Sequence, residues 1–249
     1  MKQALIRLYG AFCYLVFFFT FLYLIGFIAG LPLPRTIDSG PASHAIIAIP
    51  VNMLLMMLFA VQHTIMARRG FKRRWLKIVS WRTERSTFVL AASLILILLF
   101  WQWRPIPRVV WDLTGGPLNL PLQLLAWAGW GIVLLSTFNI DHFDLFGLRQ
   151  SFAGRGKRAV RPPDLIATGF YRIVRHPLLL GFLIAFWSAP RMTAGHFLFA
   201  AFNTVYILIG IQFEERDLTR LYRGAYTAYR KRVPMLLPPF GRAKEDPVD

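Results

Sequence analysis

The chain has 249 residues, of which 56% are hydrophobic and only 16% are charged. This apolar fraction exceeds what the core of a water-soluble protein of this length needs, so much of the apolar surface is expected to face lipid. The formal net charge is +17, but the Lys and Arg residues gather in three blocks, at 68–85, 149–175 and 216–244, instead of covering one soluble surface, so nucleic acid is not an expected partner.

Four apolar segments, at 9–30, 44–66, 86–103 and 122–143, are each long enough to cross a bilayer as a helix, which takes about 18 residues or more. The first is too long for a secretion signal and lacks a clear cleavage pattern, so we expect a retained helix. It contains Cys13, the only cysteine, so neither a disulfide nor a thiolate metal cluster is expected within one chain. Proline and glycine mark the two outer loops, which we expect to be connections only.

The three basic blocks all fall on one side of this predicted arrangement. The arginines on the other side are Arg35, Arg104, Arg108 and Arg191. Because cytoplasmic loops carry an excess of Lys and Arg, we expect both termini and the loops around Lys72 and Lys157 to be cytoplasmic. The chain is therefore predicted to be a multi-pass membrane protein.

Beyond the fourth segment, 178–213 is apolar but interrupted at Ala189, Pro190, Arg191 and Gly195. Each half has about 12 to 18 residues, which is short for a full crossing, so a tilted or partly inserted helical hairpin and two full spans both stay open. In 214–232, apolar and aromatic side chains recur at helical spacing opposite arginines, which predicts an interfacial amphipathic helix. The predicted fold is one all-α integral membrane domain over 1–249, with four spanning helices, a short C-terminal helical hairpin and an interfacial amphipathic helix.

Polar clusters stand at both ends of the predicted hairpin. Arg175 and His176 precede it, and Glu214 and Glu215 follow it. Because a hairpin brings its two ends together, these four side chains are expected to lie close to one another. Ionisable groups at the edge of an apolar segment are costly to desolvate, which makes this cluster the default functional site of a membrane protein.

The last third of the chain carries four short patterns, which in chain order are Arg175-His176-Pro177-x-x-x-Gly181, Glu214-Glu215-x-x-Leu218, Tyr226-x-x-Tyr229 and Val233-Pro234-x-Leu236-Leu237-Pro238. In this order and spacing they resemble the isoprenylcysteine carboxyl methyltransferase fold family. Where that family usually has a tyrosine two residues after the proline, this chain has Leu179. Upstream, Asn139-Ile-Asp-His-Phe-Asp-Leu-Phe-Gly-Leu-Arg149 more narrowly resembles the bacterial membrane methanethiol S-methyltransferases.

The resemblance implies an enzyme of the bacterial inner membrane with its active site facing the cytoplasm. Such an enzyme would use S-adenosylmethionine to methylate methanethiol, a small volatile thiol, giving dimethyl sulfide and S-adenosylhomocysteine. The region 165–238 would bind the cofactor. The residues implicated there are Tyr171, Arg175, His176, Pro177, Gly181, Glu214, Glu215 and Tyr229.

These residue types also suit the ligand chemically. A guanidinium such as that of Arg175 can bind a carboxylate through two hydrogen bonds. A carboxylate such as that of Glu215 can accept hydrogen bonds from ribose hydroxyls, and the rings of Tyr171 or Tyr229 would favour a sulfonium cation. The sequence lacks a strand followed by a glycine-rich turn, so helix ends and the hairpin are expected to hold the cofactor.

Methyl transfer to sulfur needs a thiolate, because thiols are largely protonated near neutral pH. His142 and Asp144 lie at the cytoplasmic end of the fourth apolar segment and are the expected catalytic residues, one of which would take the thiol proton. Together with Asp141 they could instead cap a helix end. The other histidines singled out, His44, His63 and His196, are expected to be interface or packing residues.

Two alternatives stay open at this point. Within enzymes, the acceptor could be a lipid amine or an isoprenylcysteine carboxylate, which would need a lateral opening between helices. In another class, the chain could be a non-catalytic membrane protein, or a membrane reductase of the same fold that binds a nicotinamide cofactor. The sequence predicts no oligomeric state.

Overall fold

A computed structural model describes residues 2–154, 165 and 167–237. The predictions for the loop around Lys157 and for the tail beyond Leu237 lie outside these residues. In chain order the elements are α1 (Lys2–Ala29), α2 (Ala45–Ala67), α3 (Arg69–Trp75), α4 (Trp81–Gln102), β1 (Val109–Asp112), α5 (Asn119–Ile140), α6 (His142–Leu145), α7 (Leu148–Phe152), the 3-10 turn η1 (Gly169–Arg172), α8 (Pro177–Trp187), β2 (Arg191–Thr193), α9 (Ala194–Tyr222) and α10 (Gly224–Arg232).

Among the described residues, five helices are long and apolar enough to cross a membrane, namely α1, α2, α4, α5 and α9. The first four coincide with the four apolar segments of the sequence, because a run of about 20 apolar residues satisfies its backbone groups in lipid only as a helix. The chain is therefore a mainly helical, multi-pass membrane protein. The fifth helix comes from the region expected to form a short hairpin.

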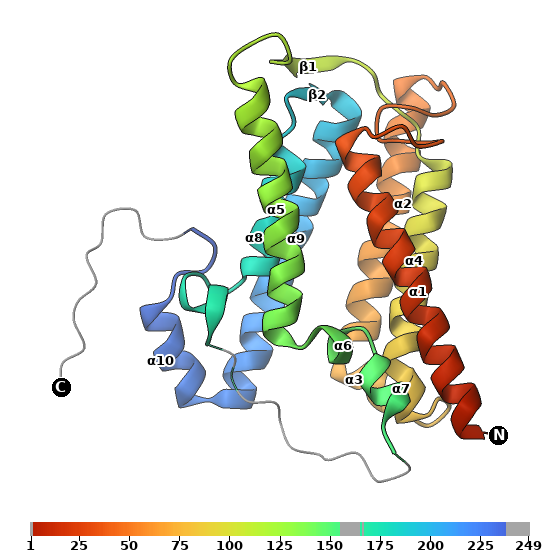
Figure 1. Cartoon of the computed structure of the whole chain (residues 1–249), viewed down its shortest axis with the longest axis vertical. Helices are drawn as coiled ribbons and strands as arrows, with labels where there is room; N and C mark the ends of the chain where they lie inside the picture. The colour runs from red at the N-terminus through yellow and green to blue at the C-terminus, as the bar shows by residue number, and fades with distance from the viewer. Residues whose placement is uncertain (1, 155–164, 166, 238–249) are drawn as a thin grey trace.

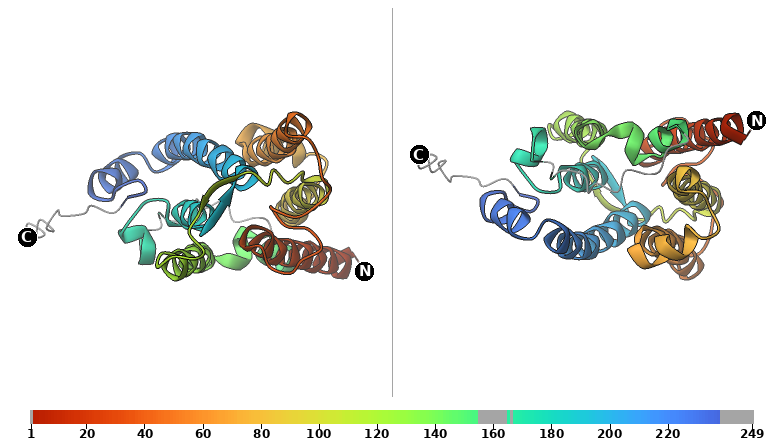
Figure 2. Two further views of the ribbon diagram at one scale, coloured as in Figure 1. Left: turned by 90° about the horizontal axis from the view of Figure 1, so that it is seen from above. Right: turned by 90° about the horizontal axis from the view of Figure 1, so that it is seen from below.

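The helices form two groups that stand side by side (Figure 1; Figure 2). One group contains α1, α2 and α4, and the other contains α5, α8 and α9. The two short strands lie at one end of the bundle, called here the strand end. The N-terminus, α3, α6 and α7 lie at the opposite end, called here the basic end because it carries the arginines of α3.

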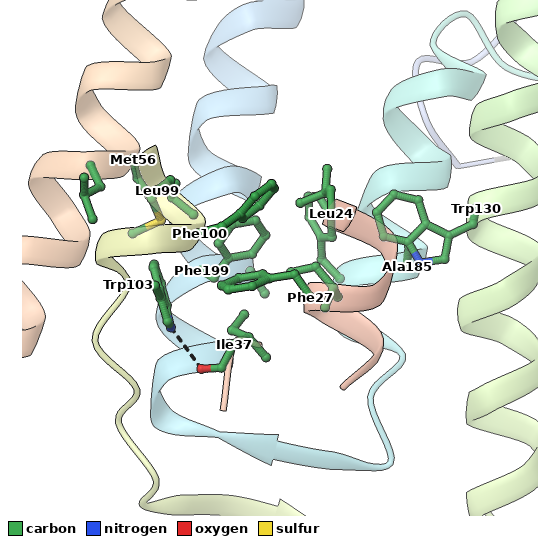
Figure 3. Close-up of a cluster of buried hydrophobic side chains, with 14 residues drawn as sticks. Leu24, Phe27, Ile37, Met56, Leu99, Phe100, Trp103, Trp130, Ala185 and Phe199 are labelled. Carbon is green, nitrogen blue, oxygen red and sulfur yellow. Dashed lines mark hydrogen bonds between the residues drawn. The ribbon is translucent and has the colours of Figure 1, made fainter. Parts of the chain in front are cut away.

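An aromatic core joins the two groups near the strand end (Figure 3). Phe27 and Phe100 from one group pack at 5.0 Å between ring centroids, and Trp103 meets Phe199 of α9 at 6.0 Å. The indole Nε1 of Trp103 donates to the carbonyl of Ile37 at 2.9 Å, so its one polar atom is satisfied inside the core.

The outer loops are more than connections, so that expectation was wrong. β1 and β2 pair antiparallel, with Val109 opposite Thr193 and Asp112 opposite Arg191. The pairing gives hydrogen-bond partners to backbone groups of two connecting segments. These groups would otherwise stay unpaired near the bilayer surface. Strands of four and three residues are too short to show an alternating pattern in the sequence.

The predicted hairpin is asymmetric. Its first arm, α8, has 11 residues, whereas its second arm, α9, has 29 and is long enough to span. The hydroxyl of Thr193 accepts a hydrogen bond from the backbone N–H of His196, which starts α9 directly after β2. The second arm is therefore longer than the 12 to 18 residues expected for each half, so the prediction of a short hairpin was wrong for that arm.

The predicted amphipathic helix over 214–232 is not one element. Its first part continues α9 as far as Tyr222, and the chain then turns at Arg223, which adopts a left-handed backbone with φ 46°. A new helix, α10, begins at Gly224. The helical periodicity of the sequence runs across this break, and periodicity alone does not show where a helix bends.

Glycines set the contact between α5 and α8. A Cβ built on Gly181 would lie 2.7 Å from the carbonyl oxygen of Gly129, and one built on Gly129 would lie 2.7 Å from the backbone nitrogen of Ala185. Both distances are below van der Waals contact, so the two backbones touch and leave no room for larger side chains. The structure thus places Gly181 against α5.

We expect Gly181→Ala to lower the thermal unfolding midpoint of the detergent-solubilised protein, because the added methyl group overpacks this contact at a cost of about 1 to 3 kcal/mol. Gly131→Ala on the same α5 helix is the matched control, since its Cβ would meet nothing within 4 Å. Intrinsic tryptophan fluorescence on heating measures both. Equal midpoints for the two variants would contradict the close contact.

Candidate active site

The two ends of the hairpin meet, as the sequence predicts. Pro177 begins α8, where its fixed φ suits the first helical turn, and His176 directly precedes it. The backbone N–H of Arg175 donates to the carbonyl of Pro234 at 2.9 Å, and that of His176 donates to Met235 at 3.2 Å. The segment after α10 therefore lies along the entry to α8, so patterns far apart in the sequence form one site.

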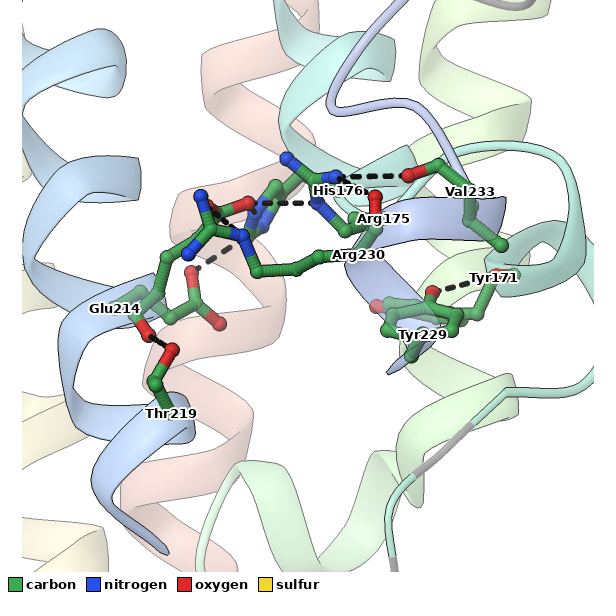
Figure 4. Close-up of polar contacts among 9 residues, drawn as sticks. Tyr171, Arg175, His176, Glu214, Thr219, Tyr229, Arg230 and Val233 are labelled. Carbon is green, nitrogen blue, oxygen red and sulfur yellow. Dashed lines mark hydrogen bonds and ion pairs between the residues drawn. The ribbon is translucent and has the colours of Figure 1, made fainter. Parts of the chain in front are cut away.

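Glu215 is the centre of a buried ionic cluster, and its partners Arg175, His176 and Arg230 are labelled in Figure 4. Its Oε1 accepts from Nε of Arg175 at 2.7 Å and lies 3.2 Å from Nε2 of His176, and its Oε2 lies 3.2 Å from Nε of Arg230. Glu215 is 6% exposed and His176 5%, so water contributes little to their solvation. A buried carboxylate is tolerated here because several donors surround it.

Arg175 also joins two further segments to the cluster. Its Nη1 donates to the carbonyl of Val233 at 2.8 Å and to that of Arg230 at 3.1 Å. One guanidinium thus connects the start of α8, the middle of α9 and the end of α10. Within the part of the chain that the structure describes, only its Nη2 makes no hydrogen bond.

Glu214 differs from its neighbour in exposure. Its side chain is 53% exposed, and its Oε2 lies 3.5 Å from Nδ1 of His176. The two glutamates therefore contact opposite nitrogens of the same imidazole. Glu215 belongs to the interior of the cluster, whereas Glu214 stands at its edge, where a ligand from solvent can reach it.

Three tyrosines surround the cluster. The hydroxyl of Tyr229 donates to the carbonyl of Tyr171 at 2.6 Å, which ties α10 to η1. Burial raises the pKa of Tyr229 to about 12, and burial followed by the charge of Glu214 raises the pKa of Tyr171 further. Burial also raises the pKa of Tyr226, with Glu215 adding to the shift. All three phenols therefore stay protonated near neutral pH and are able to donate a hydrogen bond.

The hydroxyl of Tyr226 is buried and has no hydrogen-bond partner among the described residues. Its ring packs at 5.9 Å from that of Tyr229, and its side chain is 1% exposed. Buried hydroxyls are nearly always paired, so an unpaired one beside charged groups indicates that a further polar partner fits there.

His142 begins α6, directly after the end of α5, and hydrogen bonds hold its ring on both sides. Its Nδ1 lies 2.8 Å from Oγ1 of Thr137, and its Nε2 lies 2.8 Å from the hydroxyl of Tyr14 in α1. The ring also stacks on Phe138 at 4.5 Å. Burial lowers the pKa of His142, with a smaller opposing effect of Asp141. A neutral imidazole that accepts one bond and donates the other fits this setting.

The acidic residues beside it act as the helix cap considered above. Oδ1 of Asp141 accepts from the backbone N–H of Asp144, and its Oδ2 pairs with Nη1 of Arg149 at 2.6 Å. The exposed Asp144 accepts from Nε2 of Gln150 at 3.0 Å. No hydrogen bond or ion pair among the described residues joins these side chains to the cluster. Gly169 of η1 packs on Asn139 near the end of α5, which brings the two sets of residues near each other.

The sequence analysis gave no site role to two members of the cluster, Arg230 and Tyr226, although Tyr226 belongs to one of the four quoted patterns. They stand four residues apart in α10, so both project from one face of that helix. Their spacing could have indicated this, because a basic residue four positions from an aromatic residue lies on the same face of a helix. The arginine was instead assigned to the polar side of a single interfacial helix, which the break at Arg223 rules out.

The fold and the site define a multi-pass membrane protein with a buried ionic cluster that joins the last helices. The chain is 52% identical over 231 residues to Methanethiol S-methyltransferase 1 of Bradyrhizobium diazoefficiens, across 93% of this chain and 81% of that protein. It is 51% identical over 239 residues to Methanethiol S-methyltransferase of Mycobacterium tuberculosis, across 96% of this chain and 98% of that protein. No protein-family model and no solved structure matches the chain.

A third relative, Methanethiol S-methyltransferase of a Pseudomonas species, is 47% identical over 237 residues and matches 95% of this chain and 91% of its own length. The chain therefore belongs to the methanethiol S-methyltransferase family. The names of these relatives indicate an enzyme that transfers a methyl group.

Proposed function

We propose that this protein transfers the methyl group of S-adenosylmethionine to methanethiol, giving dimethyl sulfide and S-adenosylhomocysteine. Family membership supports the reaction, and the names of the relatives supply the acceptor. The observation in the structure that carries the proposal is the unpaired, buried hydroxyl of Tyr226 beside the cluster centred on Glu215. It fits a polar ligand next to groups that can bind both carboxylate and hydroxyls.

The residues that would hold the donor are those of region 165–238. S-adenosylmethionine supplies an electrophilic methyl group on a sulfonium. Nη2 of Arg175 and the hydroxyl of Tyr226 are free to donate to its carboxylate or ribose, and the exposed carboxylate of Glu214 is free to accept. The rings of Tyr171 and Tyr229 would favour a cation.

Three of the remaining residues implicated by the sequence would position other parts of the site and would not bind the donor directly. Glu215 is already shared by three basic side chains, so we propose that it orients Arg175 and His176 and does not bind ribose directly. Pro177 and Gly181 would set the start and the depth of α8. The catalytic role of His142 and Asp144 stays a prediction. For His142 to take a proton, it would have to give up its contact with Tyr14 or Thr137.

The test is conversion of methanethiol by the purified protein. We expect S-adenosylmethionine and methanethiol to give dimethyl sulfide in the headspace, measured by gas chromatography, at a rate far above that with an isoprenylcysteine or phosphatidylethanolamine. Boiled protein is the control for the spontaneous reaction. If the protein binds S-adenosylhomocysteine but forms no dimethyl sulfide above this control, the thiol acceptor is wrong.

We further propose that the basic end of the bundle, with the cluster, faces the cytoplasm of the cell membrane. Two single-cysteine variants in a Cys13→Ser background test this orientation. Ile78, between α3 and α4, is 80% exposed, so Ile78→Cys reports on the basic end, and Gly115→Cys reports on the outer loop after β1. A membrane-impermeant maleimide added to intact spheroplasts is expected to label the cysteine at 115 and not the one at 78. Labelling at 78 alone would reverse the orientation.

A further inference from the structure

A groove of about 650 Å³ runs between α2 and α9. Most of its walls are apolar, with Ala60, Ile207 and Phe213 among the lining residues. Val61 and Ile209 in the same walls are about half exposed, at 46% and 51%, so the groove opens sideways between two spanning helices. A small apolar solute dissolved in the bilayer can therefore enter it without crossing a polar surface.

The groove is continuous with the candidate active site. Leu179 and Glu214 both line it, and these residues flank His176 and Glu215 on α8 and α9. The charged residues Arg68, Arg69 and Asp217 lie at its basic end. An acceptor held in the groove would thus have an apolar environment on one side and the ionic cluster on the other.

His63 is the titratable side chain of α2 in this groove. Its ring stacks on Phe59 at 5.3 Å and contacts Phe88 at 4.9 Å. Its Nδ1 is buried and has no hydrogen-bond partner among the described residues. Its Nε2 has no such partner either, but this atom is not fully buried. The ring thus packs as expected from the sequence, but packing leaves both ring nitrogens without a described partner, so they are available to a ligand.

A cation stands close to His63. The guanidinium of Arg85 lies 5.2 Å from the centroid of Phe88, the same ring that His63 contacts. Its Nε donates to the carbonyl of Leu145 at 2.7 Å, which fixes its position. This fixed positive charge keeps the imidazole neutral, which is the form that can accept a proton, and it stabilises a thiolate formed beside it.

We propose that the groove between α2 and α9 holds the acceptor thiol and that His63 takes its proton. This inference rests on the proposed function and deepens it by naming the acceptor site. The S–H bond breaks and its proton moves to Nε2 of His63. The sulfur lone pair then forms the new bond to the methyl carbon as the bond from that carbon to the donor sulfur breaks, and the imidazolium later returns its proton to solvent.

The first test compares two thiols of similar size. We expect His63→Phe, which keeps the ring stack, to lower kcat/KM for ethanethiol by about a hundredfold, the usual contribution of a general base. For 2,2,2-trifluoroethanethiol, which ionises more readily, the loss should be less than about tenfold, because less help is needed to form the thiolate. Affinity for S-adenosylhomocysteine, measured by calorimetry, should stay unchanged. Equal losses for both thiols, or none, would overturn the assignment of His63.

The second test fills the groove. Gly210 lines it, and a Cβ there would meet nothing within 4 Å, so Gly210→Leu should fold and occupy the space. We expect KM for methanethiol to rise about tenfold with unchanged affinity for S-adenosylhomocysteine, the result of losing roughly 1.4 kcal/mol of acceptor binding. Gly131→Leu on α5, equally open but outside the groove, is the matched control and should behave as wild type.

The proposed function and the acceptor groove can be disproved separately. Wild-type protein that binds S-adenosylhomocysteine but forms no dimethyl sulfide would overturn the proposed function, and with it this inference. Wild-type protein that forms dimethyl sulfide, together with a Gly210→Leu variant of unchanged KM, would overturn the groove alone and leave methyl transfer to the thiol standing.

Discussion

Replacing Glu215 by alanine is expected to weaken binding of S-adenosylhomocysteine by at least about thirtyfold, or roughly 2 kcal/mol, and to abolish dimethyl sulfide formation. The carboxylate balances Arg175, His176 and Arg230 within 3.2 Å or less. Its loss leaves two guanidinium groups close together in a poorly solvated site, where removal of one partner of an ion pair costs several kcal/mol. Isothermal titration calorimetry in detergent measures the affinity.

Glu214→Ala is the matched control, because it removes the same side chain one residue earlier. That carboxylate is half exposed and lies no closer than 3.5 Å to His176, so the loss of affinity should be less than about tenfold, in keeping with the small worth of exposed ion pairs. If both variants bind with wild-type affinity, or if Glu214→Ala is the worse of the two, Glu215 is not the centre of the site.

The spanning helices and the meeting of Arg175 with Glu215 could be predicted because each depends on a local rule. A long apolar run has one stable form in lipid, and a hairpin returns its ends to one level. Both rules act on residues that are near in sequence or joined by one turn. The patterns at 175–181, 214–218 and 226–229 therefore carried enough information to locate the cluster.

Other features could not be predicted, because they depend on contacts between distant segments. The pairing of β1 with β2 joins two loops, and neither is strand-like alone. Arg175 donates hydrogen bonds to the backbone carbonyls of Val233 and Pro234. Any residue type offers such a carbonyl, so the side chains at these positions do not reveal the contact. His63 looked like one more histidine on an apolar helix, and only the position of α9 shows that it lines a groove.

The second large effect is a loss of stability expected when His142 is replaced. Its two ring nitrogens join Thr137 of α5 to Tyr14 of α1. His142→Leu leaves the hydroxyl of Tyr14 without a described partner, whereas the hydroxyl of Thr137 still donates to the carbonyl of Leu134 at 2.6 Å. Each unpaired buried polar group costs about 1 to 3 kcal/mol, so the thermal midpoint in detergent should fall by several degrees. His142→Gln, which keeps one donor and one acceptor, should lose less.

The pH dependence of stability has a definite sign. Burial lowers the pKa of His142 in the folded state, so the unfolded chain, with a pKa of about 6.5, binds the proton first. Stability from this residue is therefore full above pH 6.5 or so and is lost as the pH falls below it, by up to about 1.4 kcal/mol for each unit of pKa difference. Thermal midpoints of wild type and His142→Leu should converge on acidification.

The same variants decide between His142 and His63 as the base. If His142 only joins helices, His142→Gln should lose turnover to a similar extent with ethanethiol and with the more acidic fluorinated thiol, because neither reaction uses its nitrogen for proton transfer. If it is the base, the loss should be concentrated in ethanethiol, as predicted above for His63→Phe. Since both nitrogens of His142 are engaged while neither nitrogen of His63 has a described partner, we expect the thiol-dependent loss only at His63.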